Sequence, residues 1–184
     1  MKKESAELYP GQRGKEKREL FKRFRLRAIE DVFKGRFFAL FDHCCFKCCA
    51  KERPHKIIGH PPILCIDHHV PMALGGHLEP GNLVALCRRC NEAKLDKDPE
   101  QFYSPAELER LRPLLDQQQA IFEFAFDWDA WNADRGMYLL NLGVEAALVH
   151  EFLHDPTHPD FIGTQSNTIG VSISVEEEGN LRVR

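Results

Sequence analysis

Two pairs of cysteines constrain this chain more strongly than any other feature of its sequence. Each pair has the spacing C-x2-C, and the pairs are Cys45 with Cys48 and Cys87 with Cys90. Four thiolates at this spacing suit a closed tetrahedral zinc site, which keeps no open position for a substrate. We therefore predict a structural zinc ion that stabilises a segment too small to bury much apolar surface. Coincidence and redox-active pairs are the alternatives.

The remaining cysteines and the N-terminus indicate a reducing compartment. The chain has 184 residues and seven cysteines, and an odd number argues against a disulfide framework. Cys44, Cys49 and Cys65 are expected to behave as small buried apolar residues. The charged N-terminus lacks the apolar segment of a secretion signal, and no apolar run is long enough to cross a membrane. We expect a cytoplasmic protein without membrane contact.

The net charge of -3 conceals a strong asymmetry along the chain. Residues 1–60 contain 16 Lys or Arg against 8 Asp or Glu, a balance of +8, and residues 61–100 contain 4 against 6, a balance of -2. Residues 101–184 contain 5 against 14, a balance of -9. The basic third suggests contact with a polyanion, whereas the acidic half is expected to dock another protein.

The basic part of the chain begins with a predicted helical arm over residues 1–41. Within it, residues 13–41 have helical periodicity and are expected to form one long helix or two helices in line. Apolar side chains occupy one face, while basic side chains, Lys22 and Arg25 among them, lie largely on the other. This basic face is either a solvated surface or a surface that contacts phosphates.

Three short elements are predicted around the two cysteine pairs. Residues 63–67 form an apolar run that predicts a strand, and residues 82–86 predict a second strand after a Pro-Gly turn. Residues 88–98 have the composition of a helix. The local order is therefore strand, loop, strand, helix.

Helices and an aromatic core segment are predicted for the acidic half. Ser104 and Glu107 have the spacing of a capping box at a helix start, and Pro113 is expected to kink or split this helix. The aromatic stretch at residues 121–131 is expected in the core, with a patch for a partner as the alternative. A further helix is predicted over residues 143–154.

These expectations together describe an α+β fold. It contains a small ββα core with a structural zinc, flanking helices and a C-terminal β-hairpin, which the alternating apolar residues near the end predict. The predicted units are a basic helical arm at 1–41, a central metal-binding domain at 42–100, a helical region at 101–155, and a loop with the hairpin at 156–184.

The central segment also carries groups suited to phosphodiester hydrolysis. Asp67 and His68 stand together at the end of the first predicted strand, and Asn91 lies on the predicted helix. A carboxylate and a carboxamide are oxygen ligands that suit a hard cation such as Mg²⁺. An imidazole can take a proton from an attacking water molecule. Metal, base and phosphate suffice for the reaction.

The order of these residues resembles the HNH, or ββα-metal, nuclease family. The family pattern is C-x2-C, D-H-x-x-P, G-G, N-L and C-x2-C-[HN]-x-x-K. After the first cysteine pair, this sequence supplies D-H-H-V-P at 67–71, G-G at 75–76, N-L at 82–83 and C-R-R-C-N-E-A-K at 87–94. The last letter of the H-N-H triplet is Asn91 here, a variant that the family accepts.

The resemblance implies a role for each residue of the motif. His68 would be the general base, and Asn82 would hold the loop between the strands and so orient that base. Asp67 and Asn91 would bind a catalytic Mg²⁺ or Mn²⁺ ion. The implied activity is endonuclease cleavage of DNA, with RNA ranked second, in a restriction or antiphage setting. The alternative is an inactive zinc-knuckle module that binds DNA or acts as a scaffold.

Further basic residues lie on the predicted helix beside the motif. Arg88, Arg89 and Lys94 either contact phosphates or form a solvated helix face.

A second motif points to a different enzyme class. His150, Glu151 and His154 match H-E-x-x-H on a predicted helix, the pattern of zinc metalloproteases. Such a site needs a third ligand, for which His158 and Asp160 are near in sequence but not at a metzincin spacing. The alternatives are an ordinary helix end, where imidazoles are favourable, and a secondary metal site.

Overall fold

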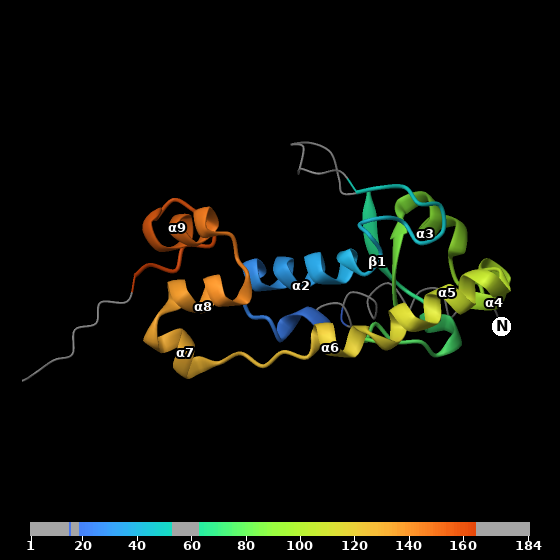
Figure 1. Ribbon diagram of the computed structural model, residues 1–184, viewed down its shortest axis with the longest axis horizontal. Coiled ribbons are helices and arrows are strands. Elements are labelled where there is room, and N and C mark those ends of the chain that lie inside the picture. The colour runs from blue at the N-terminus through green and yellow to red at the C-terminus, as the bar shows by residue number, and fades with distance from the viewer. Residues whose placement is uncertain (1–14, 16–18, 53–62, 165–184) are drawn as a thin grey trace, which may run out of the picture.

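The computed structural model describes residues 15, 19–52 and 63–164, which form helices around one two-stranded sheet (Figure 1). This mixture confirms the α+β character of the prediction. The predicted hairpin near the C-terminus lies outside the described residues. The elements are α2 (Arg27–Ala39), β1 (Leu64–His68), the 3₁₀ helix η1 (Met72–Leu74), β2 (Leu83–Cys87), α3 (Arg88–Lys94), α4 (Pro99–Phe102), α5 (Pro105–Asp116), α6 (Gln118–Phe122), α7 (Trp128–Ala133), α8 (Arg135–Leu142) and α9 (Ala146–His154).

The sheet and the helix that follows it occur in the predicted order. β1 and β2 pair antiparallel, from Leu64 opposite Cys87 to His68 opposite Leu83. Each strand begins one residue later than predicted. The helix α3 follows β2 directly and packs against both strands. It ends at Lys94, before the predicted end at residue 98, because Leu95 leaves the helical conformation with φ 49° and ψ -130°.

The predicted N-terminal helix is interrupted. Residues 19–22 are helical, but the chain turns at residues 23–26 and α2 begins at Arg27. Arg25 has φ 61°, a conformation that cannot continue a right-handed helix. The turn allows Phe24, which is fully buried, to stack on Phe33 with ring centroids 4.5 Å apart. The predicted long helix is therefore two helical segments that meet at a bend.

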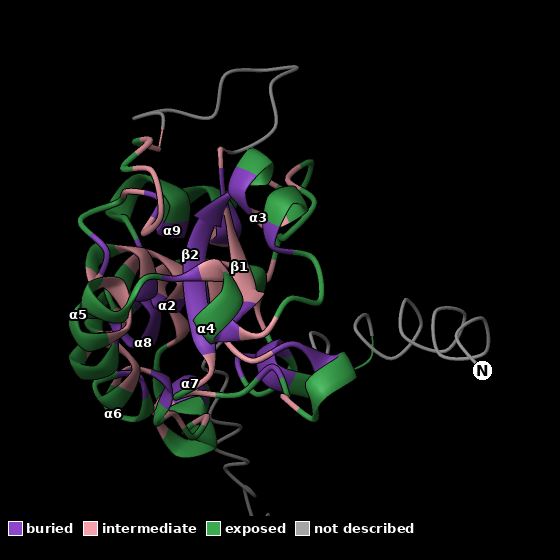
Figure 2. Ribbon diagram, turned by 90° about the vertical axis from the view of Figure 1, so that its right-hand side faces the viewer, coloured by how far each residue is buried: buried purple, intermediate pink, exposed green. Residues whose placement is uncertain are grey.

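One hydrophobic core joins the sheet to the helices behind it. Every residue of β2 is buried, and Figure 2 shows this strand enclosed, with exposed faces of α5 and α3 on either side. The helix α2 packs against α6 and α8. The aromatic stretch predicted as core contributes the buried side chains of Phe122 and Trp131, whereas Trp128 remains 50% exposed. The core prediction is therefore confirmed for Phe122 and Trp131, while Phe124 and Phe126 pack against the core half-buried and much of the rest of the stretch is exposed.

The helices of the acidic half differ in detail from the prediction. The capping box of Ser104 and Glu107 is present at the start of α5. This helix continues through Pro113 without the expected split, although proline cannot donate a hydrogen bond to the carbonyl of Glu109, itself an exposed residue. The predicted helix at 143–154 begins later, at α9, because Gly143 terminates α8 with φ 98°.

None of the helices within the described residues combines the length and the apolar character needed to span a membrane.

Candidate metal centre and active site

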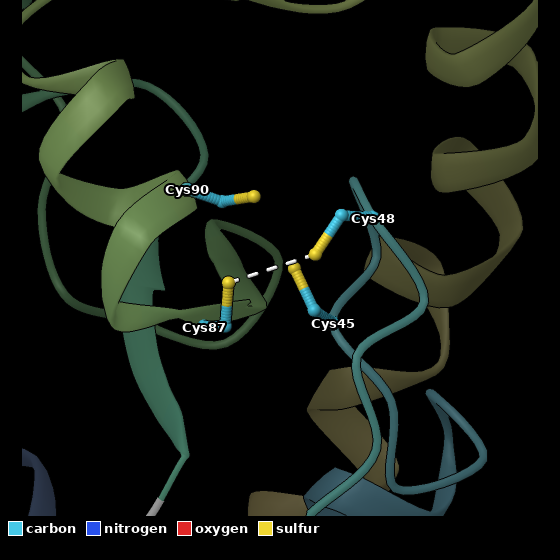
Figure 3. A group of neighbouring side chains, drawn as sticks. All are labelled: Cys45, Cys48, Cys87 and Cys90. Carbon is cyan, nitrogen blue, oxygen red and sulfur yellow. Dashed lines mark hydrogen bonds between the residues drawn. The ribbon is translucent and has the colours of Figure 1, made fainter.

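The four cysteines of the two C-x2-C pairs converge on one point. Their Sγ atoms all lie within 4.8 Å of one another, and those of Cys48 and Cys87 are 3.6 Å apart. Zinc–sulfur bonds of about 2.3 Å in a tetrahedron place the sulfurs roughly 3.8 Å apart. Figure 3 shows Cys45 and Cys48 on the loop after α2, facing Cys87 and Cys90 at the end of β2 and the start of α3.

The environment of these thiols suits a metal cation. Burial raises the pKa of Cys45 and of Cys90, so both resist ionisation without a positive partner. A hydrogen bond from the backbone N–H of Ala50 lowers the pKa of Cys48 to about 7. A bound cation deprotonates such thiols outright, and the donor set therefore fits zinc.

Long-range bonds attach the first cysteine loop to the rest of the molecule. Lys47, between Cys45 and Cys48, donates through Nζ to the carbonyl of Phe102 at 2.8 Å and to Oε2 of Glu107 at 2.7 Å. The loop is thereby joined to the start of α5, which the sequence did not predict.

A second bond network joins the same loop to β1. The carboxylate of Glu52 accepts hydrogen bonds from the backbone N–H groups of Ile63 and Leu64 at 2.9 and 2.8 Å. The first cysteine pair is therefore held against the strand that carries Asp67.

Beside the cysteine cluster, the polar motif residues share one pocket of about 180 Å³. Asp67 and His68 reach it from the end of β1, and Asn91 reaches it from α3. His68 is only 7% exposed, so a reacting group must enter the pocket to meet its imidazole. The lining residues are Asp67, His68, Pro71, Asn91, Glu92, Lys94 and Leu95.

The side-chain amide of Asn91 reaches the carboxylate of Asp67. One terminal atom of the amide lies 3.2 Å from each Asp67 oxygen, and the other lies 3.5 Å from Sγ of Cys65. With the amide oxygen towards Asp67, three oxygens converge, an arrangement that suits a hard cation. With the nitrogen towards Asp67, the amide donates hydrogen bonds instead. A half-turn of the amide converts one arrangement into the other.

The structure corrects the prediction for Lys94. Its side chain is 1% exposed, and Nζ donates to Oδ2 of Asp67 at 2.9 Å. Burial by itself raises the pKa of Asp67, but His68 and Lys94 lower it more, so the pKa falls below its usual 3.8. Lys94 is therefore a buried partner of Asp67 and not part of a solvated helix face or a surface contact for phosphates.

The segment containing both sites matches a known family. Residues 45–105 match the HNH endonuclease family. The match begins at the first cysteine of the zinc-type cluster and extends through β1, β2 and α3 to the start of α5. It confirms the resemblance seen in the sequence. No curated protein and no solved structure matches this chain.

Within this HNH segment, Asn82 organises the connection between the strands. Its Oδ1 accepts from the N–H of Val70 at 2.7 Å, and its Nδ2 donates to the carbonyls of Val70 and His77 at 3.1 and 2.8 Å. Its backbone carbonyl accepts from the N–H of His69 at 2.7 Å. Asn82 therefore holds the chain directly after His68 through four hydrogen bonds.

A buried glutamine that the sequence did not predict forms hydrogen bonds with the start of β2. Gln118 of α6 is fully buried, and its Oε1 accepts from the N–H groups of Gly81 and Leu83 at 2.8 and 3.1 Å. Its Nε2 donates to the carbonyl of Leu83 at 2.6 Å. No local pattern predicts this contact, because the partners lie 35 or more positions apart.

The basic residues predicted to bind nucleic acid do not form one continuous surface. Arg88 and Arg89 are exposed on α3, where Nε of Arg88 lies 3.7 Å from Glu92. Lys22 is also exposed. Arg25 instead stacks over Trp128 at 4.7 Å, at the end of α2 remote from α3 (Figure 1). Arg88 and Arg89 share α3 with Asn91, which lines the pocket, but neither arginine lines the pocket itself.

The H-E-x-x-H motif does not assemble a protease-type metal site. The rings of His150 and His154 lie 4.7 Å apart on α9, while Oε2 of Glu151 lies 3.8 Å from Nε2 of His158. Among the described residues, only the four cysteines form a group of three or more His, Cys, Asp or Glu placed to share an ion. A third zinc ligand for the histidine pair is therefore absent from that part of the chain.

Proposed function

We propose that this protein is a metal-dependent endonuclease that hydrolyses phosphodiester bonds in DNA. The observation that carries the proposal is the meeting of the Asp67 carboxylate, the Asn91 amide and the His68 imidazole in one pocket. A scaffold that needed only its zinc ion would require the cysteines but none of these three groups.

Each residue has a distinct part in the proposed reaction. Asp67 and Asn91 would hold Mg²⁺ or Mn²⁺, which when bound stabilises charge on the phosphoryl group and the leaving oxygen. His68 accepts a proton from the attacking water molecule through its imidazole. Lys94 keeps Asp67 in its ionised form, in which the carboxylate can act as a ligand. Asn82 fixes the position of the segment after His68 through its hydrogen bonds to Val70.

Residues 42–100 would form the ββα-metal catalytic unit, closed by zinc on Cys45, Cys48, Cys87 and Cys90. The helical region at 101–155 would support this unit, as the contacts of Glu107 and Gln118 with it suggest. Arg88 and Arg89 would approach DNA phosphates from α3.

The acidic surface of the helical region suits a protein partner better than DNA, and a restriction or antiphage system is the setting we expect.

Plasmid nicking with Mg²⁺ or Mn²⁺ tests the proposal directly. The His68→Ala variant should lose activity by a factor of roughly 100 or more, because general bases contribute about 10²–10⁴. The matched control is His150→Ala, which removes an exposed imidazole from α9. It should retain wild-type activity.

Zinc content, measured in the same samples, reports whether each variant has folded. A zinc-loaded wild type that nicks no DNA or RNA with any divalent ion would rule out the proposed activity. DNA binding without cleavage would favour the inactive zinc-knuckle module instead.

A further inference from the structure

Gln118 forms hydrogen bonds with both neighbours of Asn82, the residue that holds the segment after His68. Its Oε1 accepts from the N–H groups of Gly81 and Leu83 at 2.8 and 3.1 Å, and its Nε2 donates to the carbonyl of Leu83 at 2.6 Å. One fully buried side chain thus satisfies three backbone groups at the entrance to β2. Gln118 lies outside the segment that matches the HNH family, which ends at residue 105.

The pairing of β1 with β2 links Leu83 to His68. The two residues are opposite each other in the sheet, and next to them the N–H of His69 donates to the carbonyl of Asn82 at 2.7 Å. In antiparallel strands, hydrogen-bonded pairs alternate with pairs whose polar groups point outward and whose Cα atoms are about 4.5 Å apart. Leu83 and His68 form a pair of the second kind, because both polar groups of Leu83 bond to Gln118. A shift of Leu83 therefore moves the backbone of His68 directly.

The outer edge of β2 has a second anchor two residues further along. The N–H of Phe46, in the loop between Cys45 and Cys48, donates to the carbonyl of Ala85 at 2.9 Å. The cysteine loop therefore holds the middle of β2, while Gln118 holds its start, where the strand meets the catalytic motif. A two-stranded sheet alone is at best marginally stable in water, so these outer contacts determine where the strand lies.

We propose that Gln118 is a positioning residue of the active site, so that the catalytic unit extends beyond the HNH segment to α6. The proposal rests on the proposed nuclease function. Gln118 touches no substrate, because its side chain is fully buried. It acts through Leu83 and Asn82, which set the position of the backbone that carries His68. A displacement of about 1 Å at a reacting group can lower a rate by about 100-fold.

Gln118→Met tests the proposal, because methionine has a similar length but cannot replace the three hydrogen bonds. On plasmid DNA, kcat per zinc-loaded molecule should fall by about 10-fold or more, while KM changes by about 2-fold or less. A second readout does not depend on cleavage. The backbone amide NMR signals of His69 and Val70 should shift, because both N–H groups bond to Asn82.

A second variant covers the case in which Gln118→Met does not fold with zinc. Gln118→Glu keeps the shape of the side chain and the oxygen that accepts from Gly81 and Leu83, but loses the donor to the carbonyl of Leu83. The same losses and shifts are expected for it.

Leu139→Ala is the matched control for a loss of stability alone. Leu139 is fully buried on α8, at the opposite end of the molecule from β1 (Figure 1), and its truncation leaves a cavity in the core. At a temperature where all the proteins are folded, this variant should keep the kcat and both amide signals of the wild type.

A wild-type kcat, or unshifted amide signals, in the Gln118 variant would overturn the role of Gln118 and leave the nuclease function intact. An equal loss of kcat in Leu139→Ala would also overturn it, because destabilisation alone would then explain both losses. A wild type that cuts neither DNA nor RNA would overturn the nuclease function by itself. The amide signals would then decide alone whether Gln118 sets the position of the segment after His68.

Discussion

The Nζ atom of Lys94 lies 2.9 Å from Oδ2 of Asp67, and the Lys94 side chain is 1% exposed. The last residue of α3 thus places its amino group beside the carboxylate of Asp67, near the end of β1. This pair links the helix to the strand at the point where the proposed metal ligands meet. It also explains why a carboxylate that is largely buried keeps a low pKa.

Replacement of Lys94 by Met should destabilise the protein by about 3 kcal/mol, because it leaves a buried carboxylate without its partner. Chemical denaturation of the variant and the wild type measures this difference. Lys22→Met, at a side chain that is 75% exposed, is the control and should change stability by less than about 0.5 kcal/mol.

The same variant reports on metal binding. If Asp67 binds a divalent ion, Mg²⁺ should raise the melting temperature of Lys94→Met more than that of the wild type, since the ion replaces the missing positive charge. Equal responses of the two proteins to Mg²⁺ would contradict the assignment of Asp67 as a ligand.

Loss of one cysteine ligand should remove the zinc ion. Cys87→Ser is expected to reduce bound zinc from about one per chain to near zero and to lower the melting temperature markedly, because structural zinc binding contributes directly to folding. Elemental analysis and thermal denaturation measure the two effects. Cys49→Ser changes an exposed cysteine outside the cluster and should keep the zinc. Zinc retained in Cys87→Ser would argue against a four-cysteine site.

Gly76 lies where no other residue fits. A Cβ added there would stand 1.9 Å from the carbonyl oxygen of Val70 and 2.9 Å from Nδ2 of Asn82. Gly76→Ala should therefore displace the connection after His68, cost about 2 kcal/mol or more of stability, and reduce cleavage. Gly35→Ala has open space around it in α2 and should instead stabilise the protein by about 0.5–1 kcal/mol. Denaturation of both variants provides the comparison.

Glu107 should contribute stability that depends on pH. Burial raises its pKa, but the hydrogen bonds from Lys47 and Ser104 lower it more, so the folded-state pKa is below the usual 4.5. A lowered folded-state pKa means that the contribution is complete above the unfolded-state pKa and is lost as pH falls through the folded-state pKa.

Glu107→Gln should therefore be less stable than the wild type at neutral pH, by no more than about 1 kcal/mol. The difference should disappear as pH falls below 4.5 towards the folded-state pKa. Stability measured against pH for both proteins tests this, with the exposed Glu109→Gln as control. A stability difference between the wild type and Glu107→Gln that grows as pH falls would contradict a lowered pKa for Glu107.

The sequence by itself determined the features that depend on local spacing. The C-x2-C pairs predicted the cysteine cluster, and the capping box predicted the start of α5. Both strands were located to within one residue. The motif around Asp67 and His68 also predicted the family match at 45–105. These features are visible in sequence because neighbouring residues carry both the signal and the interaction.

Only the tertiary structure decided which charged and polar residues face the solvent. A lysine on a short helix is usually solvated, yet Lys94 is buried because β1 brings Asp67 to the end of α3. Arg25 stacks on Trp128, more than a hundred positions later in the chain, and does not line the pocket that contains Asp67. Gln118 supports β2 from a helix that no local pattern connects to it. Each outcome depends on packing between segments far apart in the chain, which residue spacing does not encode.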